Sequence, residues 1–119
     1  MTLILGASHK PERYSYKAAE RLTSKGYPFV QVSNRKNENP FGPIHDQSFW
    51  QEQHDIDTVT LYIGSQHQPE YYDYLIGLHP KRVIFNPGTE NLELVRKLRE
   101  NDIASENSCT LVMLGSGVY

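Results

Sequence analysis

Cysteine is nearly absent from this sequence, in which Cys109 is the only one among 119 residues. A lone cysteine excludes an intramolecular disulfide and a zinc cluster built from cysteines. Long apolar runs are missing too. The run at residues 3–5 is far shorter than the roughly 7–15 residues of a secretory signal core, and no run approaches the ~20 residues that span a bilayer. We therefore expect a cytoplasmic protein without a membrane segment.

The sequence also has no excess of charge of either sign. The formal net charge is −2, so no overall basic field attracts nucleic acid or an anionic membrane. The five histidines form no pair with metal-ligand spacing, and we predict no metal site. Any anion-binding site must be local. The length is that of one domain, and we expect residues 1–119 to form a single one.

Short apolar runs alternate with amphipathic stretches along the chain, which is typical of βαβ units. We therefore predict an α/β fold with a mainly parallel sheet. Strands are expected at residues 2–6, 29–33, 58–63, 82–85 and 110–114, with a short edge strand near 44–45. Helices are expected at residues 16–25, 69–78 and 90–100, with a polar loop at 34–42 and a turn or short helix at 48–53.

The ends of the predicted helices carry recognisable signals. Ser15 and Thr89 are the expected N-caps of the first and third helices, because a hydroxyl oxygen can accept from the free N–H groups of the first turn. Gly26 stands where a left-handed residue ends the first helix.

The segment from Gly6 to Tyr16 has the order strand, glycine turn, helix start. In open α/β sheets this order presents backbone N–H groups and a helix N-terminus to a phosphate. Two other predicted strands end in a turn that contains glycine or asparagine, at Gly64 and at residues 86–88. Because parallel strands end at one edge of the sheet, we expect these turns to form one ligand site.

The nature of the ligand follows from the first two turns. Positions 6, 8 and 11 are Gly, Ser and Pro, so the Gly-x-Gly-x-x-Gly fingerprint of ordinary dinucleotide sites is absent, as is a Walker loop. After the second strand, Arg35 and Lys36 stand where an NAD site has a carboxylate. The two cations suit a phosphorylated ribose, either in NADP or in coenzyme A. The alternative, that both are solvated loop charges, stays open.

Several segments resemble those of the small stand-alone CoA-binding proteins, which are similar to the CoA-binding domain of the succinyl-CoA synthetase α subunit. They are Gly-Ala-Ser at 6–8, Arg-Tyr-Ser-Tyr at 13–16, Thr-Val-Thr-Leu-Tyr-Ile at 58–63, Phe-Asn-Pro-Gly-Thr-Glu-Asn at 85–91 and Cys-Thr-Leu-Val-Met-Leu at 109–114. The resemblance implies a Rossmann-like three-layer fold with strand order 3-2-1-4-5 plus a final strand. It also implies a protein that holds CoA or an acyl-CoA at the carboxyl edge of the sheet without catalytic activity of its own.

The resemblance further implies the residues that contact the cofactor. Near the diphosphate and the adenosine with its 3′-phosphate, these are Ala7, Ser8, Pro11, Arg13, Asn34 and Arg35. The glycine turn and the basic pair add Gly6 and Lys36 to the expected site. Beside the adenine or the pantetheine, they are Ile63, Gly64, Asn86, Pro87 and Glu90. Two departures concern the adenosine contacts, because the family usually has Asn-Pro where Ser33 and Asn34 stand and often has proline near Gly64.

Two other classes of function stay open. An NADP-dependent oxidoreductase shares the basic end of the second strand but needs catalytic groups for which a short chain has little room. An interaction module with a vestigial site would use the tyrosines clustered at 62–74, unless they pack on the sheet. No catalytic residue is predicted; His9 and Glu90 are the titratable groups nearest the site, and Cys109 is expected to act as a small apolar residue. A homo-oligomer and an acyl-CoA enzyme partner both stay open.

Overall fold

The computed structural model describes residues 1–48 and 55–119. The turn or short helix expected at 48–53 therefore lies almost wholly outside the described residues. Among the helices that are described, none is long and apolar enough to cross a membrane.

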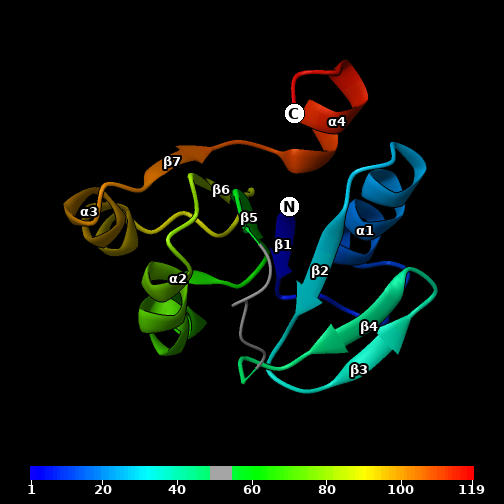
Figure 1. The fold of residues 1–119 in the computed structure, drawn as a ribbon, viewed down its shortest axis with the longest axis horizontal. Coiled ribbons are helices and arrows are strands. Elements are labelled where there is room, and N and C mark those ends of the chain that lie inside the picture. Colours follow the sequence, from blue (N-terminus) through cyan, green and yellow to red (C-terminus); the bar gives the residue numbers. More distant parts are fainter. Residues whose placement is uncertain (49–54) are drawn as a thin grey trace.

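A seven-stranded sheet forms the centre of the fold, with the order β3-β4-β2-β1-β5-β6-β7 (Figure 1). The strands are β1 (Thr2–Leu5), β2 (Phe29–Val32), β3 (Asn37–Asn39), β4 (Gly42–His45), β5 (Thr58–Leu61), β6 (Arg82–Phe85) and β7 (Ala104–Asn107). All neighbours pair in parallel except β3 and β4, which form an antiparallel hairpin. Counting only the parallel strands, the predicted order 3-2-1-4-5 plus a final strand is confirmed, and the fold is Rossmann-like α/β.

Helices cover both faces of the sheet. They are α1 (Tyr14–Ser24), α2 (Tyr72–Leu78), α3 (Leu92–Glu100) and α4 (Thr110–Ser116), with short 3₁₀ turns η1 (Ser65–His67) and η2 (Pro69–Tyr71) before α2. Successive side chains of β1 point to opposite faces, so Leu3 and Leu5 pack with α2 and α3 whereas Ile4 packs with α1 and α4. Figure 1 shows the two pairs of helices on either side of the sheet.

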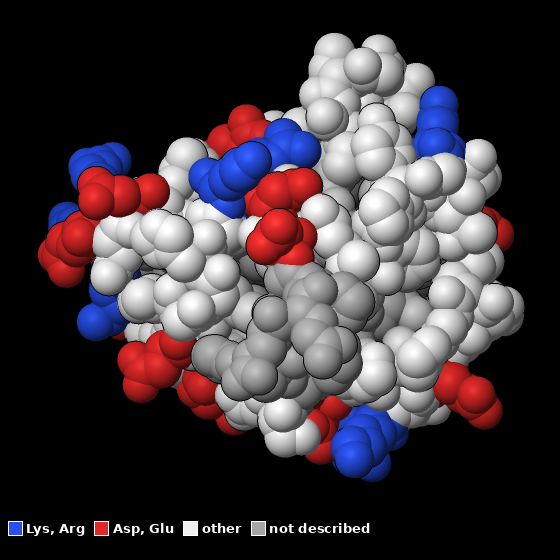
Figure 2. All heavy atoms as spheres, in the orientation of Figure 1, with Lys and Arg blue, Asp and Glu red and all other residues white. Residues whose placement is uncertain are grey.

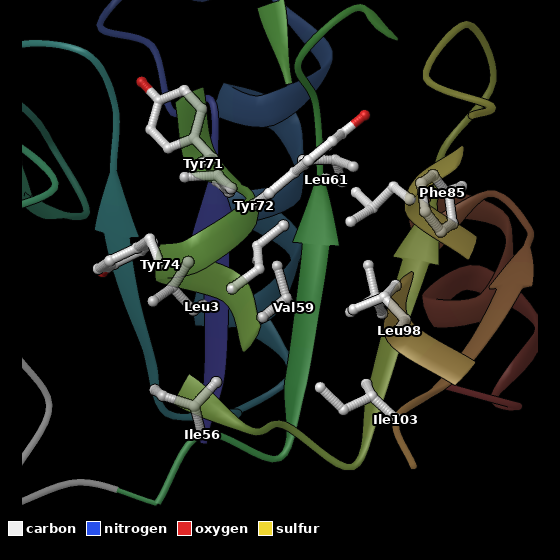
Figure 3. Packing of buried hydrophobic residues seen from close by; sticks show 14 of the residues in the cluster. Leu3, Ile56, Val59, Leu61, Tyr71, Tyr72, Tyr74, Phe85, Leu98 and Ile103 are labelled. Carbon is white, nitrogen blue, oxygen red and sulfur yellow. The ribbon is translucent and has the colours of Figure 1, made fainter. Parts of the chain in front are cut away.

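Three tyrosines of η2 and α2 belong to the core (Figure 3). Tyr71, Tyr72 and Tyr74 are 2%, 8% and 8% exposed and pack against Leu3, Val59 and other buried residues of the sheet. These three rings therefore stabilise the fold and do not offer a surface to a partner.

The helix ends differ from two of the expectations. Helix α1 begins at Tyr14, so Ser15 lies buried inside the first turn, and no side chain caps the helix. The N-cap of α3 is Asn91, whose side chain accepts from the N–H of Leu94, and not Thr89. Thr89 instead donates its hydroxyl to the main-chain oxygen of Asn86. Gly26 adopts the expected left-handed conformation, with φ of 78°.

The apolar run at 110–114 forms helix α4, so the strand predicted there is wrong. Its buried residues Thr110, Met113 and Leu114 have the i, i+3, i+4 spacing of one helix face. Among the described residues, the last strand is the polar β7, which lies at the edge of the sheet beside β6 and is largely exposed. The loop expected at 34–42 likewise contains strand β3. Strands are predicted from a sequence by their alternating apolar residues, and exposed edge strands of this kind lack that alternation.

The side chain of Asn86 joins β5, the turn after β6 and the start of α4. Its Nδ2 donates to Thr60 Oγ1 at 2.8 Å and to the main-chain oxygen of Leu61 at 2.9 Å. Its Oδ1 accepts from the N–H of Thr110 at 2.9 Å. The residue is 2% exposed, so water cannot replace these bonds. This contact fixes the start of α4 against the turn after β6.

We predict that Asn86→Ala lowers the free energy of unfolding by about 3 kcal/mol, because a buried group that loses its partner costs about 1–3 kcal/mol. Denaturation in urea measures the change. Asn107→Ala, at the exposed end of β7, is the control and should change stability by less than about 0.5 kcal/mol. Equal effects of the two variants would contradict a structural role for the Asn86 side chain.

Candidate functional site

The carboxyl ends of β1, β2, β5 and β6 open into a cavity of about 500 Å³, here called the main cavity. It lies where the strand order reverses around β1, which is the usual ligand position in open α/β sheets. Eight of the predicted site residues line it: Gly6, Ala7, Ser8, Arg13, Asn34, Arg35, Gly64 and Pro87. A second cavity of about 360 Å³ adjoins it on the α2 side and is lined by Ile63.

Besides Ile63, four predicted site residues do not line the main cavity. Pro11 and Lys36 line neither of these two cavities. The side-chain amide of Asn86 makes the buried hydrogen bonds described above. Glu90 accepts from the N–H of Gly88 through Oε1 at 2.9 Å and so shapes the turn after β6.

Gly6 lets the end of β1 approach the end of β5. Its φ is 96°, and a Cβ atom there would lie 2.9 Å from both Ile63 Cγ1 and the main-chain oxygen of Tyr62. Both distances are shorter than side chains tolerate, and the conformation itself is unfavourable for other residues. The position therefore requires glycine, and Gly6 itself lines the main cavity.

The first two N–H groups of the glycine turn are not free for a ligand. Gly6 and Ala7 both donate to the main-chain oxygen of Val32, at 2.8 and 3.1 Å. The N–H of Lys10 donates to Ser8 Oγ at 3.1 Å. The expected presentation of backbone donors by residues 6 and 7 is therefore not available, and the donors must come from elsewhere.

Helix α1 supplies those donors. Tyr14 and Ser15 line the main cavity, and the first turn has no side-chain cap and no acidic residue. The first N–H groups of a helix have no partner within it and carry the positive end of its dipole. An uncapped N-terminus that opens on a cavity is suited to bind an anion.

Positive charge gathers around the same cavity. Lys10, Arg13 and Arg35 line it together with His9, and none of the described residues that line it is Asp or Glu. By contrast, Figure 2 shows acidic and basic residues interspersed over the face that it draws. The local balance at the cavity is thus opposite to the net charge of −2 of the whole chain.

A pair of amides, which the sequence does not reveal, holds the loop that carries His9 and Lys10. Asn39 in β3 donates to the main-chain oxygen of Ser8 at 3.2 Å and to Gln31 Oε1 at 2.7 Å. Gln31 in β2 is 2% exposed and donates back to Asn39 Oδ1. The hairpin of β3 and β4 therefore fixes the loop, and Asn37 adds a contact of 3.1 Å to His9 Nδ1.

A second buried amide fixes the opposite wall of the site. Gln68 is fully buried and donates to the main-chain oxygens of Ile63 and Thr89, at 2.8 and 2.7 Å. Its Oε1 accepts from Asn91. The turns after β5 and β6 are thereby held together.

Tyr62 lies at the junction of the site. It lines the main cavity, the second cavity and a third cavity of about 200 Å³ beside Cys109. Burial raises the pKa of its hydroxyl to about 12, although the nearby Thr60 and Thr110 hydroxyls act in the opposite direction. The group is therefore protonated at neutral pH.

Fold and site together define a Rossmann-like α/β protein with a positively charged cavity at the carboxyl edge of its sheet. A family model described as the CoA binding domain matches residues 1–115. The chain therefore belongs to this CoA-binding domain family, as the sequence resemblance indicated.

Solved structures show the same fold. An uncharacterized protein is 49% identical, with a TM-score of 0.87 over 99% of this chain and 96% of that chain. A hypothetical protein from Pyrococcus horikoshii OT3 is 25% identical, with a TM-score of 0.86 over 97% of this chain and 81% of that one. The dinucleotide-forming acetyl-coenzyme A synthetase 1 of Ca. Korarchaeum cryptofilum is 16% identical, with a TM-score of 0.72 over 89% of this chain and 25% of that chain, and shares the fold. A search of curated proteins finds no match.

We predict that Gly6→Ala lowers the free energy of unfolding by about 3 kcal/mol, because it combines an unfavourable φ with a steric clash. Gly26→Ala is the matched control, since Gly26 also has a positive φ but nothing lies within 4 Å of a Cβ atom there. It should cost only about 1 kcal/mol. Thermal and urea denaturation measure the stability of both variants. Equal losses of unfolding free energy would show that the close contact with the end of β5 does not make glycine necessary at position 6.

Proposed function

We propose that this protein binds coenzyme A, or an acyl-CoA, in the main cavity and has no catalytic activity of its own. The observation that carries the proposal is the cavity itself. It combines the uncapped start of α1 with Lys10, Arg13 and Arg35 and has no carboxylate among its described lining residues. Membership of the CoA-binding domain family supports the same ligand.

In this proposal the diphosphate binds at the N-terminus of α1. Tyr14 and Ser15 offer main-chain N–H groups there, and Lys10 and Arg13 add positive charge. Ser8 and Gly6 line the cavity beside these groups, and glycine at position 6 allows the turns after β1 and β5 to approach each other. Charge-assisted hydrogen bonds of this kind are about twice as strong as neutral ones.

Arg35 is the proposed contact for the 3′-phosphate. It lies in the loop after β2, next to Asn34, and lines the main cavity. The hydroxyl of Ser33 fixes this loop, since it accepts from the N–H of Arg35 at 3.3 Å and donates to its main-chain oxygen at 3.1 Å. The pantetheine then runs past Gly64 toward Pro87, between the turns that Gln68 holds together.

We predict that Arg35→Ala weakens CoA about 10–100-fold and changes the affinity for dephospho-CoA less than about twofold, because hydrogen bonds to charged groups contribute about 1.5–3 kcal/mol. Isothermal titration calorimetry measures both ligands. Lys36→Ala is the matched control: it removes the neighbouring cation, which does not line the cavity, and should leave both affinities within about twofold.

Two outcomes would contradict this assignment. Equal losses for CoA and dephospho-CoA in Arg35→Ala would show that Arg35 does not contact the 3′-phosphate. Tighter binding of NADP than of CoA by the unaltered protein would favour the oxidoreductase instead, since a 2′-phosphate also suits a cation at the end of β2.

We predict the opposite pattern for Arg13. Arg13→Ala should weaken CoA and dephospho-CoA by the same factor, about tenfold, because both ligands carry the diphosphate. Arg99→Ala removes the same side chain from the exposed surface of α3 and should have no effect. Unchanged affinity in Arg13→Ala, measured in the same titrations, would move the diphosphate away from the start of α1.

A further inference from the structure

A hydrogen bond crosses the edge of the main cavity from the loop after β1 to strand β3. It joins His9 to Asn37, the first residue of β3, with 3.1 Å between Nδ1 of the ring and Nδ2 of the amide. Both residues line the main cavity, and both side chains are exposed, so a ligand can reach the ring. His9 is the one histidine among the described residues that line this cavity.

The amide of Asn37 has one favourable orientation. Its Oδ1 accepts from the N–H of Glu38 at 2.8 Å. If the amide were turned over, its NH₂ group would face that N–H, and two donors would oppose each other. The NH₂ group therefore faces His9. Because an amide NH₂ only donates, Nδ1 of the ring is the acceptor and carries no proton.

This hydrogen bond selects one form of the imidazole. A neutral ring that accepts at Nδ1 carries its proton on Nε2, which is then a donor. An imidazolium has a proton on both nitrogens and would set an N–H against the amide of Asn37. None of the described residues that line the cavity is a carboxylate that could accept from a second ring proton. The charged and titratable groups that line it with His9 are Lys10, Arg13, Tyr14, Arg35 and Tyr62, and Glu38 follows Asn37 in β3.

Both partners of this hydrogen bond lie on anchored backbone. The main-chain oxygen of Ser8 accepts from Asn39, and Ser8 Oγ accepts from the N–H of Lys10. These two bonds fix the loop on either side of His9. Asn37 belongs to the antiparallel hairpin of β3 and β4. The ring is therefore oriented before a ligand arrives, which reduces the entropy that binding costs.

We propose that neutral His9 binds the diphosphate through its Nε2–H, and that Asn37 is the positioning residue that fixes this form of the ring. The inference rests on the proposed function and adds to it a contact from the loop between β1 and α1. His9 immediately precedes Lys10, and both line the cavity with Arg13. Diphosphate oxygens only accept hydrogen bonds, so they need the donor that the neutral ring offers. Binding of this kind requires no proton uptake by the ring.

The first test compares CoA with dephospho-CoA by calorimetry. His9→Ala should weaken both by the same factor, about tenfold, because both carry the diphosphate and lose a hydrogen bond to a charged group. His79→Asn is the control: it removes an imidazole that lines neither of the two larger cavities, and asparagine tolerates the left-handed backbone there. It should leave both affinities unchanged. A loss for CoA alone would place His9 at the 3′-phosphate, and no loss would remove it from the site; either result overturns the proposal.

The second test exchanges the donor of Asn37 for an acceptor. Asn37→Asp keeps the shape of the side chain but holds a proton on His9 Nδ1, so Nε2 is a donor only in the imidazolium. Dephospho-CoA is the probe, because a phosphate monoester such as the 3′-phosphate of CoA itself titrates at about pH 6. From about pH 6 to about pH 8, its affinity should change less than about twofold in the unaltered protein and fall at least about fivefold in Asn37→Asp.

The double variant with His9→Ala and Asn37→Asp is the matched control for this profile. Without the imidazole, the added carboxylate repels the ligand equally across the range, because an aspartate stays ionised there. The profile should therefore be flat again. A fall that persists in the double variant would show that Asn37 does not act through His9. A fall of the same size in the unaltered protein would show that the ring binds as an imidazolium. Either result overturns the proposal.

The nitrogen NMR signals of the His9 ring report on its form without any measurement of affinity. At about pH 8 the unaltered protein should carry the proton on Nε2, with CoA or without it, and Asn37→Asp should carry it on Nδ1. His9→Ala identifies the signals. A proton on Nδ1 in the unaltered protein would show that Asn37 does not position the ring, and the proposed function would stand. If CoA does not bind to the unaltered protein, the proposed function fails, and the role of His9 fails with it.

Discussion

The buried amide of Asn86 is the interaction on which the carboxyl edge of the sheet depends. It joins main-chain or hydroxyl atoms of β5 and α4 through Leu61, Thr60 and Thr110, and its own main-chain oxygen accepts from Thr89. No member of such a network can move alone, because each lost partner leaves a buried polar group unpaired. The ends of β5 and β6 and the start of α4 are therefore held as one unit, and this unit forms one side of the ligand cavities.

The elements that local patterns encode could be predicted, and those that depend on distant partners could not. Strands β2, β5 and β6 were readable because apolar runs end at turn residues such as Gly64. The apolar run after Cys109 has a composition that also suits a strand, whereas in the structure it is a helix whose first residue is bonded to Asn86, 24 positions earlier. The exposed strands β3 and β7 have no apolar pattern to read.

The candidate site shows the same division. Gly6, Arg13 and Arg35 were found from the sequence because a turn, a helix start and a strand end each have local signals. The Gln31 and Asn39 pair, which holds the loop at Ser8, was not, since two amides on separate strands give no sign that they meet. Glu90 illustrates the converse: its position suggested a ligand contact, and in the structure its carboxylate accepts from the N–H of Gly88. Side-chain partners, unlike periodicity, are decided by tertiary structure.

The mismatch between the charge of the chain and that of its cavity has a physical consequence. At physiological ionic strength charges are screened beyond about 8 Å, so the net charge of −2 opposes an anion only weakly once the anion is inside. Within the cavity, Lys10, Arg13 and the N-terminus of α1 act at contact distance and with less water between them and the ligand. Long-range attraction therefore contributes little to recognition here. In the proposed function, selectivity therefore comes from close contacts, in which the cation at the end of β2 distinguishes a phosphorylated ribose.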